Sequence, residues 1–219
     1  MASTDLRKVI EERVSVTEFA ETPIPDAVVA DLLRLTQRAP TAFNTQPYRG
    51  IILRTAEDRA RVAESMIASN QVKVNGAPLV IAFAADLEPS KEVPRLQGLM
   101  KEGGAPQFVI DIVPGYLQGY SGEGTPAGLA WSYKQTSIAA TTFIYAARAL
   151  GLVTRPMEGF DQEKLKEALG LTDRYSVPIV ISVGYPKGDL PTKGGLRYNP
   201  TDVFFEGKLG GSTAALFEQ

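Results

Sequence analysis

Three polar residues alternate in the segment ERVSVTEF, where single valines separate Arg13, Ser15 and Thr17. In an extended backbone these three side chains would point to one face. A planar guanidinium and two small hydroxyls can together bind the oxygens of a phosphate group. A half-buried turn after a helix explains the pattern equally well, so a phosphate site needs support from elsewhere in the chain.

Further cations and an amide could supply that support. Asn70 and Lys73 are three residues apart, so a helix would place both on one side. Lys193 and Arg197 lie in a glycine-rich segment near the C-terminus. Each of these residues, taken singly, is typical of a solvated surface, but together with Arg13 the cations could converge on one anion.

Residues 39–50, APTAFNTQPYRG, predict a stiff polar loop. Proline fixes φ and supplies no N–H donor. The hydroxyl of Thr41 and the carboxamides of Asn44 and Gln46 offer hydrogen-bond donors and acceptors. The combination favours a rigid rim for a flat ligand with hydrogen-bonding edges.

Two further positions are candidates for ligand contacts. Gly159, in the segment PMEGF, permits a close backbone approach, so an N–H group there could donate to a ligand. The same segment also fits a simple turn before a helix capped by Asp161. Gln135 lies in an apolar helical run, where a buried amide needs a partner, which is either a ligand or a backbone group.

Composition excludes several kinds of chemistry. The 219 residues include no His and no Cys, which excludes a thiolate nucleophile, a Ser-His-Asp triad and the usual zinc sites. Neither a Rossmann fingerprint nor a P-loop is present. We therefore expect an organic cofactor and no metal. The net charge of −2, the lack of an apolar signal sequence and the lack of a long apolar span favour a cytoplasmic protein that binds neither nucleic acid nor membrane.

The elements that would position these residues are helices and a few strands. Apolar periodicity and caps predict helices over residues 5–12, 23–39, 55–70, 127–150 and 161–169. Apolar runs predict strands over residues 48–53, 78–86 and 176–186. Residues 91–126 read as two helices interrupted by prolines. Helices outnumber the widely spaced strands, so the sequence predicts an α+β fold with a mixed sheet between helices.

The order of these segments resembles the FMN-dependent nitroreductase family over about residues 6–203. The resemblance rests on RVSVTEF, APTAFNTQPY, the Asn70 and Lys73 pair before PLVIAFAA, the long helix with Gln135, PMEGF and the late Arg197. It implies a nitroreductase-like mixed sheet surrounded by helices in an interlocked homodimer with two FMN sites at the interface. Residues 1–219 would form one domain, with 91–126 a helical excursion over the active site and 186–219 a C-terminal arm.

The resemblance also implies roles for individual segments. Arg13 and its neighbours would hold the flavin phosphate and ribityl chain, although many relatives carry a second cation where this chain has Thr17. Lys73 would lie near the pyrimidine side of the flavin, where a cation favours the reduced form. The partner subunit would supply residues 40–44. The implied cofactor-binding residues are Arg13, Val14, Ser15, Thr17, Pro40, Thr41, Ala42, Asn44, Asn70, Lys73, Gln135, Pro156, Met157, Glu158, Gly159, Lys193 and Arg197.

The implied reaction is a ping-pong transfer of a hydride from NAD(P)H, through N5 of FMN, to a small electron-poor acceptor such as a nitroaromatic or a quinone. No side chain need act as a catalytic acid or base. Phe43, Phe108, Tyr116 and Tyr120 are candidates for the substrate pocket. An enone, a free flavin or a halogenated aromatic remains an alternative acceptor. A non-catalytic flavin-binding protein, a flavin-consuming enzyme and a structural dimer without flavin are the rival functions.

Overall fold

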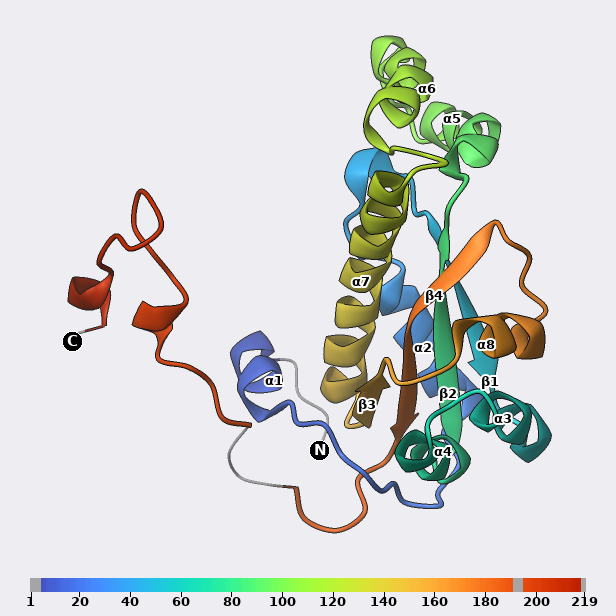
Figure 1. Cartoon of the computed structure of the whole chain (residues 1–219), viewed down its shortest axis with the longest axis vertical. Helices are drawn as coiled ribbons and strands as arrows, with labels where there is room; N and C mark the ends of the chain where they lie inside the picture. Colours follow the sequence, from blue (N-terminus) through green and yellow to red (C-terminus); the bar gives the residue numbers. More distant parts are fainter. Residues whose placement is uncertain (1–4, 191–194, 218–219) are drawn as a thin grey trace.

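A four-stranded sheet lies at the centre of the molecule, with helices on both faces (Figure 1). The structure is a computed structural model that describes residues 5–190 and 195–217. The strands follow the order β1-β2-β4-β3 across the sheet. Their bounds are β1 Tyr48–Leu53, β2 Leu79–Asp86, β3 Val153–Met157 and β4 Tyr175–Gly184.

All three pairs of neighbouring strands are antiparallel, which corrects the predicted mixed sheet. Long helix α7, Pro126–Ala149, returns the chain along the sheet after β2, so β3 runs in the same direction as β2. These two strands are separated by the oppositely directed β4. A parallel contact occurs outside the named strands, as an isolated bridge between Ser15 and Thr154.

The helices form a layer on each face and a projection at one end (Figure 1). One layer holds α2 and α7, and the other holds α3, α4 and α8. Helices α5 and α6 project beyond the end of β2, and together with the preceding 3-10 turn η2 they form the excursion (residues 89–120). The bounds are α1 Leu6–Glu12, α2 Asp26–Thr36, α3 Ala56–Ala63, α4 Ala68–Asn75, η2 Pro89–Glu92, α5 Val93–Glu102, α6 Gln107–Tyr120 and α8 Gln162–Leu169.

Local sequence signals explain where several helices begin and end. The hydroxyl of Thr55 accepts a hydrogen bond from the N–H of Asp58 at the start of α3, and Asp161 caps α8 in the same manner. Thr125 caps α7, and Pro126 occupies its first turn, where a missing N–H costs nothing. Gly170 ends α8 in the left-handed conformation that glycine adopts most readily.

The hydrophobic core lies on both faces of β2, which is buried along its whole length. Ile81 and Phe83 pack towards α2 and α7, whereas Val80 and Ala82 pack towards α3, α4 and α8. A strand covered on both faces carries an almost continuous apolar run, which the sequence LVIAFAAD displays. Within the described ranges, no helix is both long and apolar enough to cross a membrane.

Tertiary contacts alter two of the predicted elements. The helix expected over residues 55–70 is divided into α3 and α4, because residues 65–67 bond instead to residues 159–161. The backbone N–H of Ile67 donates to the carbonyl of Gly159 at 3.0 Å, and Met66 forms a bridge with Phe160. Strand β3 was not predicted, since its five residues include a proline and lack a clear alternation.

The described part of the C-terminal segment, residues 195–217, lies apart from the sheet and its helices in Figure 1. It contains two short 3-10 turns, η3 Pro200–Asp202 and η4 Ala214–Leu216. Several large apolar side chains of this segment are exposed, among them Leu196, Phe204 and Leu209. A segment of this composition has no core of its own.

Candidate functional site

Arg13 and Ser15 lie beside the edge strand β3. Arg13 follows the last turn of α1, and its Nη1 lies 3.4 Å from the hydroxyl of Ser15. The backbone N–H of Val16 donates to the carbonyl of Thr154, and this contact holds the segment against β3. Val14 is buried, whereas Ser15 and Thr17 are exposed. The structure therefore keeps the predicted alternation, with a guanidinium and a hydroxyl close together at the surface.

Asn70, Lys73 and Gly159 meet beside the same strand. Lys73 Nζ donates to Asn70 Oδ1 at 3.1 Å, so the two residues lie on one side of the helix as their spacing predicted. Asn70 Nδ2 donates in turn to the carbonyl of Gly159 at 3.3 Å. Asn70 is buried, and Glu158 is exposed. These residues, the Arg13 segment and the end of β3 form the β3 cluster: Arg13, Val14, Ser15, Thr17, Asn70, Lys73, Pro156, Met157, Glu158 and Gly159.

Gly159 is required by the close approach of α4. A Cβ atom at this position would lie 2.6 Å from Ile67 Cδ1 and 3.0 Å from Asn70 Nδ2. Ile67 is exposed and can move, but Asn70 is buried and hydrogen-bonded to Lys73. Any side chain here therefore displaces the amide of Asn70.

We expect Gly159→Val to destabilise the protein by about 1–3 kcal/mol, as overpacking does. The variant should also weaken any ligand that Asn70 and Lys73 bind. The measurements are the urea midpoint of unfolding and the Kd for FMN. Gly98→Val is the matched control, because nothing lies within 4 Å of the position of its added Cβ. Equal values for Gly159→Val and the wild type would contradict the steric argument.

The polar loop lies at the other edge of the sheet, just before β1. The backbone N–H of Ala42 donates to Gln135 Oε1 on α7 at 2.9 Å, so the buried amide of Gln135 holds the loop. Phe43, Asn44 and Gln46 all have positive φ values, of 50°, 55° and 46°. Non-glycine residues in this region are uncommon and tend to cluster at functional sites. The loop therefore has an uncommon backbone conformation that is tied to α7, and its predicted stiffness stays a prediction.

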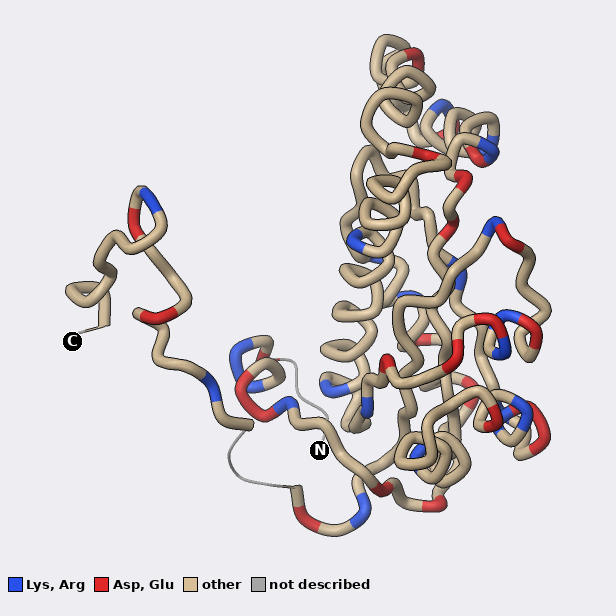
Figure 2. Tube along the Cα trace, viewed as in Figure 1, with Lys and Arg blue, Asp and Glu red and all other residues tan. Residues whose placement is uncertain are grey.

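Aromatic side chains join this loop to α6. The rings of Phe43 and Tyr116 lie 4.1 Å apart between centroids, and Tyr120 stacks on Tyr116 at 5.1 Å. Phe108 is exposed at the start of α6. Apart from Asp111, α6 carries no charged residue, and Figure 2 shows this helix almost free of charge. These residues form the loop cluster: Pro40, Thr41, Ala42, Phe43, Asn44, Phe108, Tyr116, Tyr120 and Gln135.

The two clusters lie at opposite edges of the sheet, since β1 and β3 are its outer strands. They also lie towards opposite ends of α7 in Figure 1, with α6 at one end and β3 and α4 towards the other. The length of β2 between these ends corresponds to about 23 Å of extended strand. No hydrogen bond, ion pair or ring contact joins the clusters in the part of the chain that the structure describes.

Other predicted cations are not joined to Arg13. Arg197 Nη1 donates to the carbonyls of Gly195 and Leu196 in its own segment. Lys193 lies outside the described residues. Arg155 was missed by the sequence analysis, although it directly precedes PMEGF. Its half-buried side chain forms no ion pair with described residues, and its Nε is buried without a partner, so it is a further candidate for binding an anion beside β3.

The family model and the related sequences that match this chain agree with one another. Residues 10–185 match the model described as "Nitroreductase family". A Thermus thermophilus protein named NADH dehydrogenase is 30% identical over 188 residues, which are 83% of this chain and 87% of the relative. A Streptomyces coelicolor relative, whose name combines NADH dehydrogenase and NAD(P)H nitroreductase, is 33% identical over 171 residues, or 78% and 77% of the two chains.

Solved structures show the same fold. A protein from Exiguobacterium sibiricum, solved in complex with FMN, superposes with a TM-score of 0.82 at 24% identity, over 93% of this chain and 98% of its own. A nitroreductase family protein from Streptococcus pneumoniae gives a TM-score of 0.81 at 20% identity, over 91% and 98% of the two chains. At these identities the likeness establishes the fold.

Proposed function

The chain belongs to the nitroreductase family, and on this premise we propose that it is an FMN-dependent oxidoreductase that passes a hydride from NAD(P)H to electron-poor acceptors such as nitroaromatics or quinones. The observation that carries the proposal is that two polar groups lie along β3: Arg13 with Ser15 at its edge, and Asn70 with Lys73 and Gly159 just beyond its last residue. The relatives' names and the FMN complex of the Exiguobacterium protein support the same reading.

The donor set of the β3 cluster fits the chemistry of FMN. Arg13 and Lys73 form no ion pair in the described ranges, and their contacts are with a neutral hydroxyl and a neutral amide. Both cations are therefore available to an anion. A phosphate suits the guanidinium and hydroxyl of the first pair. A flavin pyrimidine suits the cation and amide of the second pair, because its edge carries both acceptors and a donor.

When bound, FMN supplies a ring nitrogen that accepts a hydride and later releases it to the acceptor. The residues of this chain bind the cofactor and orient it. Arg13 and Ser15 hold the phosphate, while Lys73 stabilises negative charge on the reduced ring, with Asn70 fixing the position of its ammonium group. This arrangement makes the reduced state more favourable. No described residue of either cluster is assigned a catalytic proton transfer.

A homodimer would unite the two clusters, which one chain keeps apart. A second copy related by two-fold symmetry can present its loop cluster to the β3 cluster of the first copy, and the reverse, which gives two equal sites. The exposed apolar residues of the C-terminal segment favour this assembly, because they gain a partner surface. Each site would then have a polar, cationic wall from one chain and an aromatic wall from the other.

The aromatic wall favours a flat and uncharged acceptor. Phe43 and Tyr116 are in contact, and α6 carries few charges. Aromatic faces bind planar rings by offset stacking, with typical gains of about 0.5–1.5 kcal/mol per pair. Nitroaromatics and quinones fit these properties.

Absorption spectroscopy of the purified protein tests the proposal. We expect a flavin band in the visible region that bleaches on anaerobic addition of NADPH or NADH and returns when a nitroaromatic or quinone is added. A band that persists after NAD(P)H would indicate a flavin-binding protein without this activity. Irreversible loss of the chromophore would indicate an enzyme that consumes the flavin. A colourless protein that cannot be reconstituted with FMN would contradict the cofactor assignment itself.

A further inference from the structure

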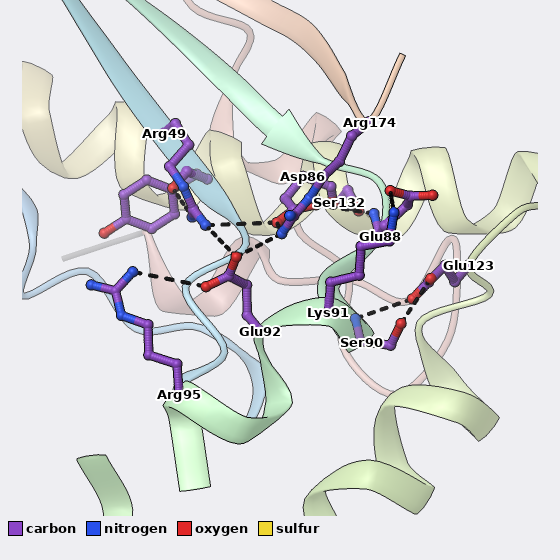
Figure 3. Close-up of polar contacts among 11 residues, drawn as sticks. Arg49, Asp86, Glu88, Ser90, Lys91, Glu92, Arg95, Glu123, Ser132 and Arg174 are labelled. Atoms are coloured by element: carbon purple, nitrogen blue, oxygen red, sulfur yellow. Dashed lines mark hydrogen bonds and ion pairs between the residues drawn. The ribbon is translucent and has the colours of Figure 1, made fainter. Parts of the chain in front are cut away.

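A group of charged side chains lies where the excursion leaves the sheet (Figure 3). Asp86, the last residue of β2, is fully buried, and its carboxylate accepts two hydrogen bonds from Arg174, from Nε at 2.9 Å and from Nη2 at 2.6 Å. The backbone N–H of Glu88 also donates to Asp86. The hydrogen bond with Asp86 is the largest cause that raises the pKa of Arg174 above its ordinary value. Such bidentate pairing fixes the guanidinium in one orientation.

Glu92 connects this pair to the excursion. It is the last residue of η2 and directly precedes α5, and its Oε1 accepts from Arg174 Nη2 at 2.7 Å. Arg49 of β1 lies 3.0 Å from the same carboxylate oxygen. Glu92 is therefore held by two arginines whose backbones belong to the sheet or its margin, as Figure 3 shows. Charge-assisted bonds of this kind are stronger than neutral ones.

A second contact closes the base of the excursion. The hydroxyl and the backbone N–H of Ser90 donate to the two carboxylate oxygens of Glu123, at 2.8 Å and 3.1 Å. Glu123 lies between α6 and α7, so this contact joins the start of the excursion to the chain that follows it. Ser90 therefore joins the two ends of the excursion to each other, and Glu92 joins its first end to the sheet.

Side-chain packing connects the base of the excursion to the aromatic residues of the loop cluster. Leu96 of α5 packs with Val113 and Leu117 of α6 and with Trp131 of α7 in a separate small core. Tyr116 is packed against this core and contacts Phe43 of the loop. Since packed side chains in a core resist independent movement, a change in the angle of α5 at Glu92 moves Tyr116 relative to the sheet.

We propose that Arg174 and Glu92 form an anchor that sets where the excursion lies, and thereby the width of the acceptor side of the site. The inference rests on the proposed function. Both are positioning residues, because neither touches the clusters that would contact flavin or acceptor. Removing the anchor should raise KM for a flat acceptor more than it lowers kcat. It should leave the Kd for FMN unchanged.

Glu92→Gln is the informative variant. It leaves the buried Asp86 and Arg174 paired, whereas replacing Arg174 would strand the buried carboxylate and risk unfolding. Glu88→Gln is the matched control, because it removes the same charge from the same turn. The carboxylate of Glu88 pairs with Lys91, which also lies in that turn, so this pair makes no link to the sheet.

The holoprotein is compared by hydrogen–deuterium exchange, by tryptophan emission and by steady-state kinetics with a nitroaromatic. Trp131 is the sole tryptophan of the chain and lies in the small core, so its emission reports the packing of the excursion on α7. For Glu92→Gln we expect faster exchange in residues 93–120, a red-shifted emission and a KM raised by about fivefold or more at similar kcat and FMN Kd. Glu88→Gln should match the wild type in all of these.

Unchanged exchange and unchanged KM in Glu92→Gln would overturn the anchor. A loss of kcat or of FMN in proportion to the change in KM would also overturn it, because that result indicates a general structural role. Failure of the proposed function is distinguishable, since a wild type without NAD(P)H oxidation would still show whether exchange and emission depend on Glu92.

Discussion

Replacement of Arg13 by alanine is expected to raise the Kd for FMN by about 10- to 100-fold, because a hydrogen bond to a charged group contributes about 1.5–3 kcal/mol. The guanidinium forms no ion pair among the described residues and lies near Ser15, so the phosphate would be its main partner. The fold should be retained, since Arg13 is only half-buried. Fluorescence titration of the apoprotein with FMN measures the change.

Arg7→Ala is the matched control for this measurement. Arg7 is an exposed cation of α1, the helix that Arg13 follows, and it belongs to neither cluster. We expect the control to bind FMN as the wild type does. Arg13→Lys should fall between the two, because an ammonium group keeps the charge without the planar pair of donors. An Arg13→Ala variant that keeps its flavin through dialysis would remove Arg13 from the phosphate site.

Two impaired variants are expected to restore activity when they share a dimer. Arg13→Ala impairs the β3 cluster, and Phe43→Asp places a charge in the aromatic wall of the loop cluster. Phe43 is exposed with φ at 50°, a region that aspartate occupies more readily than phenylalanine, so the second variant should fold. In a mixed dimer, one site combines the intact β3 cluster of one chain with the intact loop cluster of the other.

Heterodimers isolated with two affinity tags should therefore show about half of the wild-type activity per dimer, since one of the two symmetric sites is intact. Each parental variant assayed alone at low FMN concentration supplies the baseline. Recovery requires that the clusters of one site come from different chains. If both clusters served a site within one chain, every site in the mixture would remain impaired, and activity would not rise above the baseline.

Several features of the site could be predicted from residue types and spacing. The separation of Asn70 and Lys73 by three residues predicted their contact, since i and i+3 side chains are neighbours on any α-helix. The alternation of Arg13 and Ser15 similarly predicted a shared face. The covered strand β2 and the cap at Thr55 also follow from local patterns. These features depend on interactions within a few residues, which the sequence displays directly.

Other features depended on contacts between distant residues. The bonds of residues 65–67 to residues 159–161 divided a predicted helix, although the local sequence favours its continuation. The pairing of Asp86 with Arg174, 88 residues away, gave no local signal at all. Arg155 was overlooked for the same reason, because only the pairing of β3 with β4 shows that this cation lies in an edge strand beside the Ser15 segment.

The sequence by itself determined the class of fold, the family resemblance and the chemistry that is unavailable without His and Cys, since these depend on composition, periodicity and ordered motifs. The tertiary structure decided which candidate residues lie together. It united Asn70, Lys73 and Gly159, placed the APTAFNTQPY loop at the far edge of the sheet, and made every pairing of neighbouring strands antiparallel. The physical reason is that non-local strand pairing and packing, rather than local preference, fix the distances between segments remote in sequence.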